Sequence, residues 1–241
     1  MKLTEKIRTQ IKKFPKGKTF GYADLSIAKK DYLTAAKVME RLQKKGMIKK
    51  ISKGVFYKPE QTVFGELKPD YNEQLKQYLF KNGKRIAYET GFSLYNRLGL
   101  TTQVPFRISI ASRGNRISIN RGFLKADAVK SYADVTNENY QLLGFLDAIK
   151  DIKRIPDSKV RASVKILVSK IKKLDDRKKR ELVKYALLYP PRVRALLGAI
   201  LEKIDSNIKT TKLKESLNPL TKFKLGLKRT DLQTVNNWNI E

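Results

Sequence analysis

The hydrophobic period of the chain changes within residues 41–60, RLQKKGMIKKISKGVFYKPE. Before Gly46 an apolar residue recurs every three or four positions, as on one face of a helix, whereas after it one recurs every second position, as in a strand. The strand-like runs 47–51 and 55–57 flank a turn-forming triplet, Ser-Lys-Gly. This change predicts a helix that ends at Gly46 and is followed directly by a β-hairpin.

The residues before this segment predict two further helices. The first covers residues 3–14, where Pro15 ends the helical spacing of apolar residues, and a short second one covers residues 22–28. The third, which ends at the change of period, covers residues 32–45. Three helices followed by a hairpin is the order of a winged helix-turn-helix. We therefore expect residues 1–60 to form a DNA-binding domain.

The charge of the chain is strongly positive and is concentrated in this first segment. Lysine and arginine total 53 against 23 acidic residues, a formal net charge of +30. Residues 1–60 hold 17 basic and 5 acidic residues, so they are about twice as basic per residue as the rest. Such self-repulsion is relieved by binding a polyanion. The expected partner is double-stranded DNA, at the protein's own promoter.

Apolar and basic residues lie on opposite sides of the predicted helix 32–45. The apolar side, which would pack against the first two helices, holds Ala35, Val38, Met39 and Leu42. The basic side would enter the major groove, where threonine and arginine reach base edges and lysines meet phosphates. With the turn before the helix and the hairpin after it, the predicted DNA contacts are Lys29, Lys30, Thr34, Lys37, Arg41, Lys44, Lys49, Lys50 and Lys53.

Two alternatives stay open for this segment. Glu40 lies near the basic side and is either a reader of cytosine or an i,i+4 ion-pair partner of Lys44 or an i,i+3 partner of Lys37. The whole unit can also be a protein-interaction module whose lysines form a solvated surface. The order of the elements and the charge bias favour DNA binding over this second alternative.

The amino-acid composition excludes most common catalytic sites. The chain has no cysteine and no histidine, which removes disulfides, thiolate and imidazole metal sites, and histidine acid–base catalysis. Glu66-Leu67-Lys68 matches the Glu-x-Lys triplet of carboxylate-metal nucleases, but it falls in a proline-flanked segment expected to be irregular. We expect no enzyme activity and no cofactor or metal, and a metal-dependent nuclease is the third hypothesis.

The sequence gives no sign of a membrane segment. No run approaches the ~20 apolar residues that cross a bilayer. The N-terminal stretch MKLTEKIRTQIKKF is basic but has no continuous apolar core of the kind found in signal peptides. A cytoplasmic protein without a membrane partner is expected.

A second domain is predicted over residues 71–241, after a linker at residues 61–70. In it, the runs 106–111 and 116–120 alternate across Arg-Gly-Asn, which predicts a hairpin. Helical patterns then cover 138–152, 158–173, 176–188 and 192–204, and an irregular tail with Trp238 is expected to pack back on the domain. The expected fold is α+β and mostly helical: a winged helix-turn-helix plus a C-terminal α+β domain with a small sheet and a helical bundle.

A second basic run lies between Lys150 and Lys184, with 14 basic and 5 acidic residues. Aspartates at a helix start and basic residues further along complement the helix dipole, so the simplest interpretation is a solvated helix surface. The alternative is a surface for an acidic protein partner, centred on Lys178, Lys179 and Arg180.

The stretch YETGFSLYNRLGLTTQVP, residues 88–105, follows a hairpin that closes on KGVFYKP. This pairing resembles the AbiEi-type antitoxins of type IV toxin–antitoxin (abortive infection) systems. The resemblance implies that the N-terminal winged helix represses its own operon, through Thr34, Lys37, Arg41 and the hairpin lysines, and that the C-terminal domain counteracts a nucleotidyltransferase-like toxin. It transfers no catalytic residue. The alternative is a plain winged-helix transcriptional regulator with a C-terminal effector or oligomerisation domain.

Overall fold

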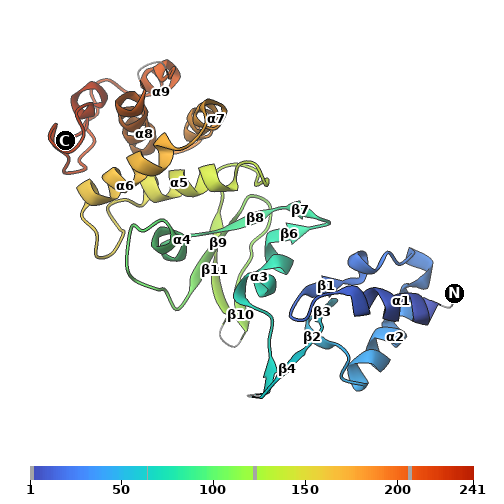
Figure 1. Cartoon of the computed structure of the whole chain (residues 1–241). Helices are drawn as coiled ribbons and strands as arrows, with labels where there is room; N and C mark the ends of the chain where they lie inside the picture. The colour runs from blue at the N-terminus through green and yellow to red at the C-terminus, as the bar shows by residue number, and fades with distance from the viewer. Residues whose placement is uncertain (1–2, 64, 122–123, 206–207) are drawn as a thin grey trace. The chain divides into compact units, whose positions relative to one another are not determined.

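A computed structural model of the protein describes residues 3–63, 65–121, 124–205 and 208–241. The chain divides into two compact units, one that ends at Lys84 and one that begins at Arg85 (Figure 1). Both units combine helices with strands. The α+β class predicted from the sequence is therefore confirmed.

The first unit begins with two helices and a small antiparallel sheet. The helices are α1 (Leu3–Lys13) and α2 (Tyr32–Lys44), and the strands are β1 (Thr19–Gly21), β2 (Lys49–Ser52) and β3 (Val55–Tyr57). The strand order is β1-β3-β2, so the predicted hairpin β2–β3 forms and β1 adds a third strand to it. Both helices lie within a residue or two of the positions that the apolar spacing predicts.

The region between α1 and α2 differs from the prediction. The expected helix at residues 22–28 is a 3-10 helix, Tyr22–Leu25, that ends at Ser26, whose φ of 46° is left-handed. A second 3-10 helix, Lys29–Asp31, leads into α2. Strand β1 has a single buried residue, so the sequence offers no alternating pattern there, and its strand conformation comes from pairing with β3.

One apolar core holds this part of the unit together. It contains Ile7, Ile11, Phe20, Leu25, Ala35, Val38, Met39, Leu42, Ile48 and Phe56, all 3% exposed or less. Burial of a large apolar side chain contributes about 1.5–3 kcal/mol to folding. The four α2 residues in this core are those predicted to face inward, and their burial fixes which side of α2 faces solvent.

The predicted linker at residues 61–70 contains regular structure. Strands β4 (Glu60–Thr62) and β5 (Gly65–Leu67) form an antiparallel pair. Helix α3 (Tyr71–Leu79) follows, and Asp70 caps it by accepting a hydrogen bond from the Glu73 N–H at 2.9 Å. Two-residue strands β6 (Phe80–Lys81) and β7 (Lys84–Arg85) come next, and the division between the units falls within β7.

The boundary at residue 60 expected from the sequence therefore differs from the compact unit in the structure. The prediction rested on Pro59 and Pro69 and on the weak periodicity between them. Three-residue strands are too short to show a period, so hydrogen bonding between β4 and β5, rather than an apolar pattern, makes this segment regular.

The second unit contains a four-stranded sheet in the order β10-β11-β9-β8. Its strands are β8 (Ala87–Thr90), β9 (Ile108–Ser112), β10 (Ile119–Arg121) and β11 (Leu124–Lys130). The predicted hairpin between residues 106–111 and 116–120 is wrong. Strand β11 lies between the two, parallel to β9 and antiparallel to β10.

Sequence patterns missed β11 because its inward positions hold mainly small residues. LKADAVK buries Leu124 and Ala126 but carries lysines and an aspartate beside them, so its alternation is weak. The strand nevertheless satisfies its backbone groups by pairing on both sides. Helix α4 (Phe92–Arg97) follows β8, and Gly99, whose φ of 75° is left-handed, lies just after its end.

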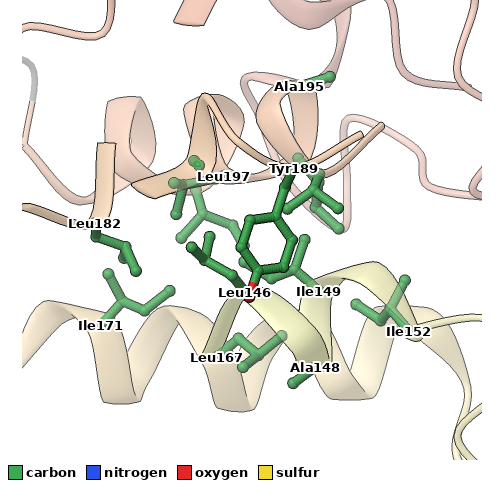
Figure 2. Packing of buried hydrophobic residues seen from close by; sticks show 14 of the residues in the cluster. Leu146, Ala148, Ile149, Ile152, Leu167, Ile171, Leu182, Tyr189, Ala195 and Leu197 are labelled. Carbon is green, nitrogen blue, oxygen red and sulfur yellow. The ribbon is translucent and has the colours of Figure 1, made fainter. Parts of the chain in front are cut away.

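The four long helices of the second unit agree with the helical patterns in the sequence. They are α5 (Tyr140–Lys150), α6 (Val160–Lys172), α7 (Asp176–Ala186) and α8 (Pro191–Ile204), and the short α9 (Thr211–Glu215) was not predicted. Figure 2 shows Leu146 and Leu167 in the core that they share, and Ile171 facing Leu182. Across the described ranges, none of the helices is long and apolar enough to span a membrane.

The tail packs back on α8, as expected. Trp238 is buried and donates a hydrogen bond from Nε1 to Glu202 Oε2 at 2.6 Å. Its ring lies so close to Gly198 that a Cβ there would overlap it. Phe223 and Ile240 also form a parallel bridge, which closes the tail on itself.

Candidate nucleic-acid interface

The outward side of α2 is basic and exposed to solvent. Thr34, Lys37, Arg41 and Lys44 are all exposed, whereas Ala35, Val38, Met39 and Leu42 on the other side are buried. The predicted orientation of α2 is therefore the one found in the structure. Because its apolar side is anchored in the core, the basic side is held in one direction.

Leu33 is a residue of this surface that the sequence analysis missed. It is 82% exposed and lies in the first turn of α2. At 100° per residue Leu33 projects opposite Leu42, close to Lys37 and Lys44. Its position relative to the buried stripe could therefore have predicted its exposure from the sequence. An exposed leucine alone is ordinary, but this one lies among the basic side chains.

Most basic side chains of this surface are not neutralised by the protein. Lys29 and Lys30 are exposed in the 3-10 turn that leads into α2, and Lys50 and Lys53 are exposed on the β2–β3 hairpin. No ion pair forms, among residues whose placement is described, at Lys29, Lys30, Lys37, Arg41, Lys50 or Lys53. These six side chains are exposed and lie outside the ion pairs of the described residues, although the charge of Arg41 contributes to lowering the pKa of the neighbouring Glu40.

Lys44 and Lys49 differ from those six because each has a carboxylate partner. Lys44 Nζ lies 3.0 Å from Glu40 Oε1 on the exposed surface of α2. The hydrogen bond from Lys44 lowers the pKa of Glu40 below its ordinary value. Of the two roles expected for Glu40, the structure contains the i,i+4 ion pair.

Lys49 Nζ lies 2.6 Å from Glu66 Oε2, and the Tyr57 hydroxyl donates to Glu66 Oε1 at 2.8 Å. The bonds from Lys49 and Tyr57 lower the pKa of Glu66. Burial, together with the neighbouring Glu66 carboxylate, raises the pKa of Tyr57 to about 12. Glu66 thus joins β2 and β3 to β5.

The Glu66-Leu67-Lys68 triplet lies in a different setting from the one expected. Glu66 and Leu67 belong to strand β5 rather than to an irregular linker. The Glu66 carboxylate is already bound to a lysine and a tyrosine of the same unit. These contacts give Glu66 a structural role in the first unit.

The basic cluster on α7 needs one correction. Lys178 and Arg180 are exposed, but Lys179 is only 8% exposed and its Nζ lies 3.2 Å from Asp176 Oδ1. It is buried because positions 179, 182, 183 and 186 form the inner side of α7. Lys179 is therefore buried on the inner side of α7 and does not lie on the exposed surface with Lys178 and Arg180.

The second unit holds a buried carboxylate that sequence analysis did not identify. Asp147 on α5 is 3% exposed. The hydroxyls of Tyr88 and Thr90 each donate to its Oδ2 at 2.7 Å, and that of Tyr189 donates to Oδ1 at 3.1 Å. Lys150 Nζ lies 3.6 Å from Oδ1.

Burial raises the pKa of Asp147, and the charge of Lys150 and the three hydroxyl donors oppose that rise. Burial, reinforced by the Asp147 charge, also raises the pKa values of Tyr88 and Tyr189. A single aspartate in an apolar helical segment does not indicate which hydroxyl groups will surround it, so this cluster could not be predicted from the sequence. Its donors come from β8, α5 and the segment between α7 and α8, so the cluster joins the sheet to the helices.

Comparison with known proteins gives a family and a fold. A family model described as "Family of unknown function (DUF6088)" matches residues 6–183. Among solved structures, the crystal structure of the RV2827C protein from Mycobacterium tuberculosis is similar, with a TM-score of 0.51 and 11% sequence identity. The match covers 92% of this chain and 85% of that chain, and at this identity the likeness concerns the fold alone. No curated protein matches significantly.

Proposed function

The chain belongs to the DUF6088 family, a family of unknown function, and we propose that this member is a winged helix-turn-helix protein that binds DNA and regulates its own promoter. The observation that carries the proposal is the exposed basic side of α2, whose opposite side is locked into the core. In the proposed complex α2 is the recognition helix and the β2–β3 hairpin is the wing.

The basic side chains of the first unit support this assignment by their position. Lys29 and Lys30 precede α2, Lys37 and Arg41 lie along it, and Lys50 and Lys53 lie on the hairpin. Basic residues on one helix and an adjoining hairpin suit a partner whose phosphates run along both edges of a groove. Neutralising several phosphates releases counterions, so affinity should fall steeply as salt is raised.

Residues on the exposed side of a recognition helix reach base edges, and on α2 this side holds Thr34 in the first turn and Arg41 in the last. Thr34 and Arg41 offer a hydroxyl and a guanidinium for hydrogen bonds to bases. Leu33 offers an apolar surface suited to the methyl group of thymine. We therefore propose Leu33, Thr34 and Arg41 as base readers and Lys50 and Lys53 as phosphate contacts.

The test uses the full-length chain and a duplex that carries its own upstream region, with an unrelated duplex of equal length. Fluorescence anisotropy at two salt concentrations should show tighter binding to the upstream duplex and a steep loss of affinity with salt. Lys37→Ala combined with Arg41→Ala should weaken binding and reduce the preference. Arg161→Ala combined with Lys165→Ala, on exposed positions of α6, removes the same charge and should leave it intact. Absence of binding by the unchanged protein contradicts the proposal.

The resemblance of residues 88–105 to AbiEi-type antitoxins extends this proposal to the second unit. We propose that it counteracts a nucleotidyltransferase-like toxin encoded beside it. Residues 88–105 form β8, α4 and the loop after α4, and Tyr88 and Tyr95 lie in the core of the second unit. This unit has a core of its own, as a separate activity requires.

Coexpression with the neighbouring gene product distinguishes an antitoxin from a plain transcriptional regulator. If the full chain with Lys37→Ala and Arg41→Ala still protects cells from that product, the second unit acts without DNA binding and the antitoxin form holds. If protection is lost with DNA binding, transcriptional regulation is the whole function and the plain regulator is correct.

A further inference from the structure

The second unit contains a pocket at the carboxyl ends of two parallel strands. Strands β9 and β11 run side by side and end together, since Ser112 lies opposite Lys130. The pocket measures about 320 Å³ and is lined by Ser112, Arg113, Gly114, Asn115, Arg116, Ala128, Val129 and Lys130. In open α/β sheets ligands bind outside the carboxyl ends of the parallel strands, and β9 and β11 are the parallel pair of this mixed sheet.

The lining of this pocket has three cations and no acidic side chain. The cations are Arg113, Arg116 and Lys130, and within the described part of the chain none of them forms an ion pair. By contrast, Arg107 at the other end of β9 is bound by Asp127 through two hydrogen bonds, one of them 3.0 Å long. The positive charge at the Ser112 end is therefore uncompensated, which suits an anion.

The backbone of the loop adds donors to these charges. The N–H groups of Gly114, Asn115 and Arg116 have no hydrogen-bond acceptor among the residues that the structure describes. All three residues are exposed. Runs of free backbone N–H groups beside basic side chains are a recurring way of binding phosphate.

The loop is held in place rather than loosely attached. Arg113 donates from Nη1 to the carbonyl oxygens of Ser131 and Tyr132, at 3.3 and 3.0 Å. The Ser131 N–H donates to the Ser112 carbonyl at 3.0 Å, and the Ser112 hydroxyl donates to the Ile86 carbonyl at 2.9 Å. These bonds tie the start of the loop to the end of β11, so little conformational entropy is lost on binding.

We propose that this pocket binds the phosphate group of a phosphorylated ligand, with Arg116, Lys130 and the loop N–H groups as its contacts. The site lies on the second unit and is separate from the DNA-binding surface proposed for α2. The phosphate can belong to a free nucleotide or to a nucleic-acid backbone, because both present the same anionic oxygens.

Isothermal titration calorimetry on the full-length protein at low salt tests the proposal with inorganic pyrophosphate and adenosine diphosphate as probes. The double variant Arg116→Gln, Lys130→Gln should weaken binding at least tenfold. The control, Arg161→Gln with Lys165→Gln on α6, removes the same charge from exposed positions of the same unit and should bind as the unchanged protein does. Both substituted pairs are exposed, and equal melting temperatures should show that folding is retained.

A second arm uses a DNA duplex in place of the small probes. If the small probes do not bind but the pocket variant alone loses affinity for DNA, the phosphate comes from a nucleic-acid backbone and the site holds. If neither probe nor duplex distinguishes the pocket variant from the α6 control, the binding is a general effect of net charge and the proposal is wrong. Lys37 and Arg41 are unchanged in every variant of this experiment, so a difference between the variants cannot come from α2.

Discussion

The carboxylate of Glu73 on α3 accepts hydrogen bonds from the backbone N–H of Thr19, at 3.0 Å, and from the Thr19 hydroxyl, at 2.9 Å. The two residues are 54 positions apart, and Thr19 is the first residue of β1, an edge strand of its sheet. This carboxylate therefore satisfies a backbone donor that no neighbouring strand pairs, and it makes α3 part of the first unit.

Glu73→Ala should destabilise the attachment of α3 by about 1–3 kcal/mol, the usual effect of leaving a partly buried donor unsatisfied. Hydrogen–deuterium exchange read at the amide groups of α3 and β1 measures this loss. Glu60→Ala is the matched control, since the Glu60 carboxylate forms a 3.9 Å ion pair with Lys16 instead. Equal exchange in the two variants would show that Thr19 does not hold α3.

The hydrogen bonds of Glu73 make the stability of α3 depend on pH. Burial alone would raise the pKa of Glu73, but hydrogen bonds from Lys76 and Thr19 bring it below its ordinary value. A carboxyl with a lowered pKa stabilises the folded state above its unfolded value of 4.5, and that stability is lost as pH falls through the folded pKa. Protection of α3 from exchange should decrease on acidification in the unchanged protein and change less in Glu73→Gln.

Asp147→Ala should destabilise the second unit by about 3 kcal/mol or more, because the hydroxyls of Tyr88, Thr90 and Tyr189 lose a buried acceptor. Urea unfolding followed by the fluorescence of Trp238, in the same unit, measures the change. Asp134→Ala, at an exposed position, is the control and should lie within about 0.5 kcal/mol of the unchanged protein.

The pKa of Asp147 is raised whereas that of Glu73 is lowered, so the two carboxyls change the stability in opposite directions with pH. Below its ordinary value of 3.8 the carboxyl is protonated in both states, so it contributes no pH dependence. As pH rises from 3.8 to the folded pKa, the unfolded chain releases its proton first, and the free energy of unfolding falls. In Asp147→Asn this part of the decrease should be absent from unfolding curves measured across that interval.

The helices of this protein were largely predictable because their apolar residues recur at a fixed spacing over many turns. Residues 160–172 and 176–186 bury a stripe at that spacing, and both form helices within a few residues of the prediction. The exposed side of α2 followed from the same rule. Local periodicity is enough when burial on one side decides the structure.

The sheet and the buried polar contacts were not predictable in the same way. The pairing of β9 with β11 rather than β10 depends on chain segments that are remote from the turn at residues 113–115. The Asp147 cluster likewise joins groups 42 to 59 positions apart. Lys179 was predicted to be exposed because of its charge, but its position on the inner side of α7 buries it.

Gly198→Ala should destabilise the tail by about 1–3 kcal/mol, since the added methyl group would overlap the ring of Trp238. Gly144→Ala is a matched comparison. Its methyl group would meet Cδ2 of Leu94, the end of a flexible side chain that can move. Thermal unfolding should show a larger decrease in melting temperature for Gly198→Ala than for Gly144→Ala. In a protein that carries Trp238→Leu, Gly198→Ala should have little further effect on the melting temperature.

In the proposed complex α2 recognises bases and the β2–β3 hairpin contacts phosphates. If Arg41 makes a bidentate contact to a base, Arg41→Ala should reduce the preference for the cognate duplex by about 1–3 kcal/mol. Leu33→Ala and Thr34→Ala should also reduce it, and Leu33→Ala only for sites with thymine at the contacted position. Lys53→Ala should weaken all duplexes equally and reduce the salt slope by about 0.9.

Lys178→Ala provides the control, because it removes one exposed charge from the second unit and should leave both the preference and the slope unchanged. Anisotropy titrations on two duplexes at several salt concentrations give both quantities for each variant. Loss of preference in Lys53→Ala with none in Arg41→Ala would place base recognition on the hairpin. Since the buried side of α2 fixes its exposed side, such a result would reassign the reading element while leaving the orientation of α2 as described.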